Sequence, residues 1–290
     1  NAIAGSLAEN VPVISIVGVP ATKTIENKTC VHHNFQDVDY HACYEAHKHV
    51  TAAAAFLTRD NAKMEIDRVL KTFVKERKPV YIAVPLDIAK MEISDKEVSY
   101  DWFSDEETLR LVSNKIAAKI NNAQKPVILG DLLVKRFDSR IEYKEFIEKT
   151  RIPTTNFLMG TNLIDMDYDL YLGGYYAGAE KYVNETDCLI AVGPVYTDLN
   201  AFGFNLPYKI NNQIAIYGTH TYVDGEKYDN VKMSDVLEAV TKLVDSKDMK
   251  ILKPAIGYEH KASSPDALTS EYIYPRLQEF IKDNDIIVAE

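Results

Sequence analysis

The chain has 290 residues, of which 46% are hydrophobic and 26% are charged, a balance typical of a globular protein and not of a disordered one. This length exceeds one average domain, so we expect two α/β domains with connecting material. The formal net charge of −10, without any lysine- or arginine-rich run, argues against nucleic acid and against an anionic membrane surface as partners.

The cysteines bear on the cellular location of the protein, and the two ends of the sequence bear on whether it is part of a longer protein. Cys30, Cys43 and Cys188 stand far apart and lack the CxxC spacing of zinc or redox sites, so we expect reduced thiols and a cytoplasmic location. No stretch approaches the roughly 20 apolar residues that span a bilayer, and no signal peptide opens the chain. Asn1 lies inside an expected helix over residues 1–9, and the sequence stops after an apolar run, so we expect both ends to be cut.

The first part of the chain alternates strand-like and helix-like patterns. The run VPVISIV at 11–17 is β-branched and bounded by turn residues, which predicts a buried strand. A loop that follows such a strand is where open α/β sheets bind ligands. Residues 61–75 have the spacing of an amphipathic helix, and a second buried strand is expected over 80–85.

A second unit begins after a connecting stretch over residues 92–107. Helices are expected over 109–120, 141–149 and 233–244, with Ser234 as the N-cap of the last, and strand-like runs over 125–130, 152–158, 188–192 and 213–217. This alternation predicts an α/β fold with parallel sheets flanked by helices on both faces. A linker, a helix over 270–282 and an opening strand over 285–290 complete the expected elements.

Histidines gather in one region of the sequence. His32 and His33 are adjacent, and three more of the seven histidines follow within eighteen residues, at positions 41, 47 and 49. Zinc binding would need ligands on a shared face, which adjacent histidines seldom provide. Solvated loop residues and acid–base residues are the two other interpretations, because imidazole titrates near neutral pH.

Several segments together resemble the thiamine diphosphate-dependent 2-oxo acid decarboxylases, the family of pyruvate, indolepyruvate and branched-chain decarboxylases. NVPVISIVGVP at 10–20, the VHH after it, and ERKPVYIAVPLDIA at 76–89 are similar to the pyrimidine-binding domain of that family. KPVILGD at 125–131, DCLIAVGPVYTDLN at 187–200 and NDIIVAE at 284–290 follow in the order of its later domains.

The resemblance covers nearly the whole chain and implies three regions. These are the later part of a pyrimidine-binding domain over 1–95, a complete Rossmann-like central domain over 108–245, and a linker with the start of a pyrophosphate-binding domain over 246–290.

The resemblance also implies roles for individual residues. His32 and His33 correspond to the catalytic histidine pair of the family, which helps to bind the 2-oxo acid and handles protons after carbon dioxide leaves. An imidazolium suits both tasks, since it can hold a carboxylate and deliver a proton to a carbanion-like carbon. Glu290 resembles the glutamate that opens the third domain near the cofactor, so a cofactor-binding role is expected for it.

The parent protein is expected to form an aldehyde and carbon dioxide from a small 2-oxo acid, with thiamine diphosphate and magnesium, as a homodimer or homotetramer. The resemblance implies that the activating glutamate of the family would lie upstream of Asn1 and its GDG...N magnesium motif downstream of Glu290. The nearest sequence, VDGEK at 223–227, is predicted to be a surface turn. We therefore expect the 290-residue chain by itself to be inactive.

Two other functions remain open from the sequence. An acetolactate synthase-like carboligase shares the fold and the cofactor but commonly lacks the paired histidines. A non-catalytic regulatory or assembly module is the alternative outside enzymes. GGYYAG at 173–178 does not follow the dinucleotide-binding pattern, and the sequence does not indicate which 2-oxo acid is the substrate.

Overall fold

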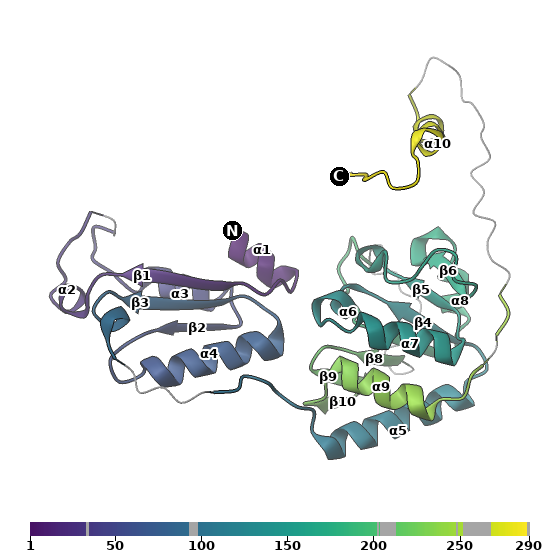
Figure 1. Cartoon of the computed structure of the whole chain (residues 1–290), viewed down its shortest axis with the longest axis horizontal. Helices are drawn as coiled ribbons and strands as arrows, with labels where there is room; N and C mark the ends of the chain where they lie inside the picture. The colour runs from purple at the N-terminus through teal and green to yellow at the C-terminus, as the bar shows by residue number, and fades with distance from the viewer. Residues whose placement is uncertain are drawn as a thin grey trace. The chain divides into compact units, whose positions relative to one another are not determined.

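A computed structural model describes residues 1–32, 35–92, 98–201, 203, 213–247, 249–251 and 268–288. The chain divides into two units, Asn1–Ile251 and Leu252–Glu290. The first unit contains two separate sheets, and the described part of the second contains helix α10, Ser270–Phe280 (Figure 1). Within the described ranges, no helix has both the length and the apolar character needed to cross a bilayer.

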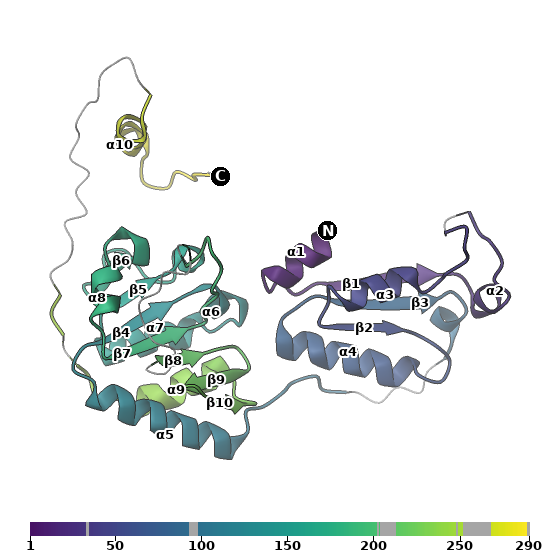
Figure 2. The same cartoon turned by 180° about the vertical axis from the view of Figure 1, so that it is seen from behind.

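The smaller sheet has three parallel strands in the order β1-β3-β2, which are Ile14–Val19, Val80–Pro85 and Ala53–Phe56. Helix α4, Ala62–Glu76, packs Val69 against Ala55 and Ile82 on one face. Helix α3, Ala42–Lys48, covers the other face, where Tyr81 and Ala83 point, and Figure 2 shows it in front of the sheet. Shorter elements complete this part of the chain: α1 at Ala2–Ala8, α2 at Thr22–Glu26 and η1 at Ile88–Lys90.

Strand β1 is more exposed than its sequence predicts. The pattern at 11–17 predicted a buried strand, but the strand begins at Ile14, and Ile16 is 69% exposed. The reason is its position: β1 pairs only with β3, at the edge of the described sheet, while α3 and α4 pack against β2 and β3. The prediction of a strand is confirmed, and the prediction of its burial is wrong for this structure.

The larger sheet has seven strands in the order β10-β9-β8-β7-β4-β5-β6. Its parallel part consists of five strands, namely β4 at Pro126–Gly130, β5 at Thr154–Asn156, β6 at Tyr171–Gly174, β7 at Cys188–Val192 and β8 at Gln213–Ile216. The chain proceeds from β4 to β5 and β6 on one side and then returns to β7 and β8 on the other. The β4–β7 boundary is therefore the point at which the strand order reverses, where such sheets form a crevice.

The last two strands of this sheet are antiparallel, which the sequence did not predict. Strands β9, His220–Val223, and β10, Glu226–Asp229, form a hairpin next to β8. Its two turn residues, Asp224 and Gly225, both have positive φ, as the tightest hairpin turn requires. The prediction that VDGEK is a turn is thereby confirmed, and the predicted fold of parallel sheets flanked by helices is confirmed with this antiparallel hairpin added at one edge.

Helices cover both faces of the larger sheet, as the α/β prediction requires. One face packs against α5 at Glu106–Asn122, α7 at Arg140–Thr150 and α9 at Met233–Leu243, through side chains such as Ile116, Phe146 and Val236. The other face, with Leu129 and Leu189, packs against 3-10 helix η3 at Tyr175–Ala177 and α8 at Glu180–Asn184. Short helices α6, Leu132–Arg136, and η2, Leu158–Gly160, follow β4 and β5 directly.

The helix boundaries follow local capping chemistry. The side chain of Asp105 accepts a hydrogen bond from the Thr108 N–H over 2.8 Å, and this interaction with Thr108 lowers the pKa of the carboxyl. Helix α9, in contrast, begins one residue after Lys232, whose backbone is extended, so the prediction of Ser234 as the N-cap is wrong. Ser234 lies within the first turn, and its hydroxyl donates to Asp235 over 3.3 Å.

The described part of the second unit contains the predicted helix. Helix α10 ends at Phe280, close to the expected boundary, and includes Pro275. Residues 285–288 form no strand, and the described part of this unit offers no other strand for them to pair with. Residues 289 and 290 lie outside the described residues, so the end of the expected strand is not described.

Candidate functional site

The first candidate site is the loop that follows β1. Because β1 and β3 are parallel, their carboxyl ends meet at one edge of the small sheet. Asp87, just after β3, accepts a hydrogen bond from the backbone N–H of Thr22 over 2.8 Å, and this bond lowers the pKa of Asp87. The start of α2 is thereby fixed against the end of β3, and the chain continues from α2 into the histidine region.

The loop over residues 27–41 is tied together by one tyrosine. The Tyr40 side chain is buried, and its hydroxyl donates to the carbonyl of Thr29. Asp39 accepts a hydrogen bond from the backbone N–H of His41 over 2.9 Å, which fixes the start of α3. Thr29 and Tyr40, on either side of His32, are thus held next to each other.

His32 is an exposed residue of this loop. His33, its predicted partner, and Glu290, the predicted cofactor-binding residue, lie outside the described residues. The structure therefore describes one of the three predicted site residues, His32, which lies in the segment between α2 and α3. Cys30, two residues before His32, is an exposed free thiol, and Cys43 and Cys188 are free as well, as the sequence predicts.

The neighbouring histidines are held by aromatic rings. The His41 ring lies 4.3 Å from the ring of Phe56, and the His47 ring stacks on Tyr81 at 4.1 Å. His47 also forms a 2.6 Å hydrogen bond between its Nδ1 and the carbonyl of Cys43. Among the residues that the structure describes, no three His, Cys, Asp or Glu side chains are placed to hold a metal ion. The zinc interpretation of the cluster gains no support from these positions.

A second polar centre lies where the strand order of the larger sheet reverses. Asp131 directly follows β4 and is fully buried, with 0% of its surface exposed. Its Oδ2 accepts hydrogen bonds from the Val195 N–H over 2.7 Å and from the Asn200 side chain over 2.8 Å. Burial nevertheless raises the pKa of Asp131 to about 6, because loss of water outweighs these hydrogen bonds.

Two buried oxygens near this centre lack hydrogen-bond partners. They are Oδ1 of Asp131 and the hydroxyl of Tyr143. A side chain on Gly130, the residue before Asp131, would collide with the Tyr143 ring, since a Cβ there would lie 2.7 Å from Cζ. Tyr143 is therefore packed tightly against the end of β4, and burial raises the pKa of its hydroxyl.

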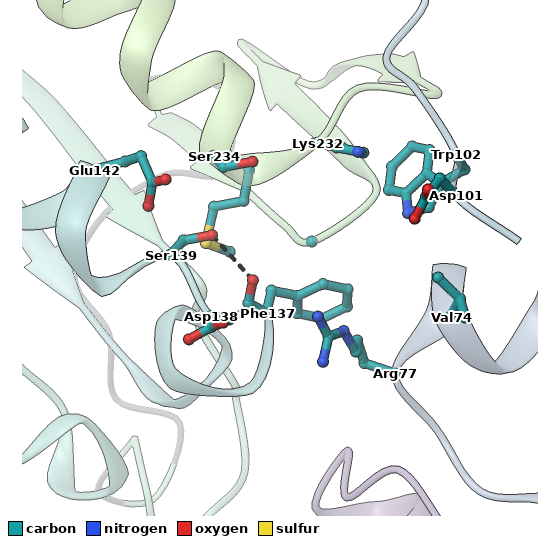
Figure 3. A pocket seen from close by; sticks show the side chains of 12 residues that line it. Val74, Arg77, Asp101, Trp102, Phe137, Asp138, Ser139, Glu142, Lys232 and Ser234 are labelled. Carbon is teal, nitrogen blue, oxygen red and sulfur yellow. Dashed lines mark hydrogen bonds between the residues drawn. The ribbon is translucent and has the colours of Figure 1, made fainter. Parts of the chain in front are cut away.

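A polar cavity of about 270 Å³ lies beside the starts of α7 and α9 (Figure 3). Arg77 and Lys232 bring positive charge to it, and Asp101, Asp138 and Glu142 bring negative charge. The Glu142 Oε2 is buried without a hydrogen-bond partner. The Ser139 hydroxyl donates to the carbonyl of Phe137 over 3.3 Å, the dashed line in Figure 3. The cavity is thus a mixed-charge site that no sequence motif indicated.

The sequence contained a partial signal for the Asp131 centre. An aspartate directly after the buried run KPVILG stands where a parallel strand ends, the usual place for ligand-binding or structural polar groups. Its partner Asn200 is 69 residues away and has no local pattern that points to Asp131. The cavity had no signal at all, because its lining comes from five separate segments.

Comparison with known proteins shows which proteins the chain is similar to. Residues 113–243 match the central domain of thiamine pyrophosphate enzymes. Over its whole length the chain is 30% identical to a putative pyruvate decarboxylase of Schizosaccharomyces pombe. It is 27% identical to a pyruvate decarboxylase of Candida albicans and 28% identical to pyruvate decarboxylase isozyme 2 of Saccharomyces cerevisiae. The chain spans 54% of the length of each of these three relatives.

Proposed function

We propose that the chain forms part of a thiamine diphosphate-dependent enzyme that cleaves a 2-oxo acid into an aldehyde and carbon dioxide. Similarity over the full 290 residues to pyruvate decarboxylases from three yeasts is the observation that carries the proposal. It favours a decarboxylase over the carboligase and the non-catalytic module. We propose pyruvate or a similarly small 2-oxo acid as the substrate.

We propose that His32 and His33 serve the reaction as proton-handling residues. The position of His32 supports this role, because it is exposed in the segment that follows β1 and α2, and open α/β sheets bind ligands in the loops beyond the carboxyl ends of their strands. An imidazolium there can pair with the carboxylate of the 2-oxo acid. It can then donate its proton to the carbon that has lost carbon dioxide.

Thiamine diphosphate, when bound, accepts the electrons of the carbon–carbon bond that breaks. The residues of this chain do not fit its diphosphate and magnesium end. The sequence contains no GDG, and the related VDG at 223–225 is the turn between β9 and β10. We therefore propose that the rest of the cofactor site, including the magnesium ligands, is contributed by other parts of the whole protein.

Further properties of the whole protein remain proposals. These are the division at 1–95, 108–245 and 246–290, assembly into a homodimer or homotetramer, and a cytoplasmic location. Glu290 is proposed to contact the cofactor. The inactivity of the 290-residue chain alone also remains a prediction.

The proposal is tested with the whole protein encoded by the gene. It is incubated with small 2-oxo acids, thiamine diphosphate and magnesium, and the products are separated by chromatography. Free aldehyde and carbon dioxide support the decarboxylase. An acyloin as the main product would replace it with the carboligase, and no turnover of any 2-oxo acid would favour the non-catalytic module. The 290-residue chain assayed in parallel is expected to release no aldehyde.

A further inference from the structure

The polar cavity beside the starts of α7 and α9 is lined by charged side chains that do not pair with one another. Three are acidic and two are basic, namely Asp101, Asp138, Glu142, Arg77 and Lys232. Within the described part of the chain, none of the five forms an ion pair with any residue. A charged group with restricted access to water is costly unless it is paired. Opposite charges left apart around one cavity therefore suit a bound molecule that carries both signs of charge.

Glu142 brings an unpaired negative charge to this lining. It lies in the first turn of α7, where the positive end of the helix dipole favours a carboxylate. Its Oε2 is buried without a hydrogen-bond partner. The other carboxylate oxygen, Oε1, also receives no hydrogen bond from the described residues, and it is not buried. Glu142 therefore presents to the cavity a carboxylate whose capacity to accept hydrogen bonds is not used by the chain.

Arg77 brings an unpaired positive charge from another element. It is the C-cap of α4, and the end of a helix favours a cation at this position. Its side chain is half-buried, and its guanidinium forms no hydrogen bond or ion pair with the described residues. Figure 3 shows Arg77 and Glu142 on opposite sides of the lining, with Ser139 and Phe137 between them in this view. A guanidinium binds carboxylates through two parallel hydrogen bonds, so Arg77 suits the anionic end of a ligand.

The rest of the lining limits the size of the ligand and leaves it a way in. The Phe137 ring packs directly on the backbone of Gly218, where a Cβ would overlap it, and the buried Met233 adds a second apolar side chain. These two side chains can contact the methylene groups of a ligand. Asp101 and Asp138 are exposed, so the cavity is open to solvent. Its volume of about 270 Å³ is near the lower limit of small-molecule pockets, about 300 Å³.

We propose that this cavity binds a small zwitterion, an aminocarboxylic acid whose carboxylate pairs with Arg77 and whose ammonium group pairs with Glu142. A simple anion would leave Glu142 unpaired and would meet three carboxylates, and a simple amine would leave Arg77 unpaired. A molecule with both groups satisfies both side chains. A 2-oxo acid has no ammonium group, so this ligand is not the proposed substrate. The inference does not depend on the proposed decarboxylase activity.

The first test compares ligands on the unmodified chain. Trp102 lines the cavity and is the only tryptophan in the sequence, so its fluorescence reports binding, and isothermal titration calorimetry provides an independent measurement. The probes are glycine, β-alanine and γ-aminobutyrate, which separate the two charges by increasing lengths, with butyrate and propylamine as singly charged controls. At least one zwitterion is expected to bind about fivefold or more tightly than both controls. Saturable binding of no zwitterion by either method, or equally tight binding of a control, would overturn the proposal.

The second test assigns the two ends of the ligand. Glu142→Gln and Arg77→Gln each remove one charge, and each is expected to weaken binding of the best zwitterion by about fivefold or more. Glu145→Gln, at an exposed position of α7, and Arg59→Gln, at an exposed position before α4, are the matched controls and should bind as the unmodified chain does. Equal affinities of the cavity variants and their controls would overturn the proposal. If a cavity variant does not fold, the ligand comparison on the unmodified chain still decides.

Discussion

Asn200 donates its side-chain amide to Oδ2 of Asp131 over 2.8 Å. The same amide donates to the carbonyl of Val195 over 2.7 Å, and the Asn200 oxygen accepts the N–H of Met159 over 2.8 Å. One buried side chain thus joins the end of β4, the segment after β7 and η2. The carboxyl edge of the larger sheet is held together at this residue.

Replacing Asn200 with alanine is expected to lower the free energy of unfolding by about 2 to 4 kcal/mol, because one buried and two partly buried hydrogen bonds are lost and Asp131 loses a donor. Urea unfolding followed by circular dichroism measures the change. Asn114→Ala is the control, since that exposed amide bonds only within its own helix, to the Arg110 carbonyl. A loss no larger than that of the control would show that Asn200 does not hold the edge.

The raised pKa of Asp131 predicts that the stability of the chain depends on pH. Its pKa of about 6 in the folded chain lies above the ordinary value of a carboxyl, so the folded state binds this proton more tightly than the unfolded state. Its contribution to the free energy of unfolding therefore increases as the pH falls through 6. It should amount to about 1 kcal/mol between pH 7 and pH 5.

Urea unfolding of the wild-type chain and of Asp131→Asn at both pH values isolates this contribution from that of other carboxyls. Asp169 and Glu226, for example, have lowered pKa values through bonds to Arg151 and Lys115, and they titrate equally in both proteins. The difference in stability between wild type and variant is expected to shift in favour of the wild type at pH 5. A difference that is the same at both pH values would contradict the assignment.

Gly130→Ala is expected to destabilise the chain by about 1 to 3 kcal/mol, since the new methyl group would overlap the hydroxyl and Cζ of Tyr143. Tyr143→Phe alone should be nearly neutral, because the hydroxyl that it removes is buried without a partner. Combining the two should cost less than the sum of the single changes. Strict additivity in thermal or urea unfolding would mean that the two residues do not collide.

For the whole protein, His32→Gln is expected to lower kcat for aldehyde formation by about 10²- to 10⁴-fold, the usual effect of losing a proton-transfer group. His49→Gln, at an exposed position just after α3, is the matched control and should retain wild-type turnover. The rates are measured with a coupled aldehyde dehydrogenase assay. Equal activity of the two variants would remove His32 from the proposed mechanism.

The regular elements of the fold were largely predictable from sequence. The spacing at 61–75 and the run KPVILG at 125–130 correspond to α4 and β4 within a residue or two. These patterns are local, since the period of hydrophobic residues reports the element that contains them. The hairpin of β9 and β10 was not predicted, because three of the four residues of β10 are charged and only one, Tyr228, is buried.

Properties that depend on neighbours were not predictable. The exposure of Ile16 follows from which elements pack on β1, and no feature of VPVISIV reveals it. The Asp131–Asn200 hydrogen bond joins residues 69 positions apart. Within the candidate site, the position of His32 after the first strand was predictable. The hydrogen bond between the Tyr40 hydroxyl and the Thr29 carbonyl was not, because no sequence feature distinguishes Tyr40 from the many other tyrosines in the chain.

The hairpin has one more consequence, for the outer rim of the larger sheet. Strand β10 is the last strand on its side, and three of its four residues, Glu226, Lys227 and Asp229, are exposed and charged. A strand from another molecule that added here would have to place its own side chains beside these charges. Natural proteins use such charged border strands to prevent sheets from joining edge to edge. We therefore expect the charged strand β10 to disfavour pairing of this edge with another chain.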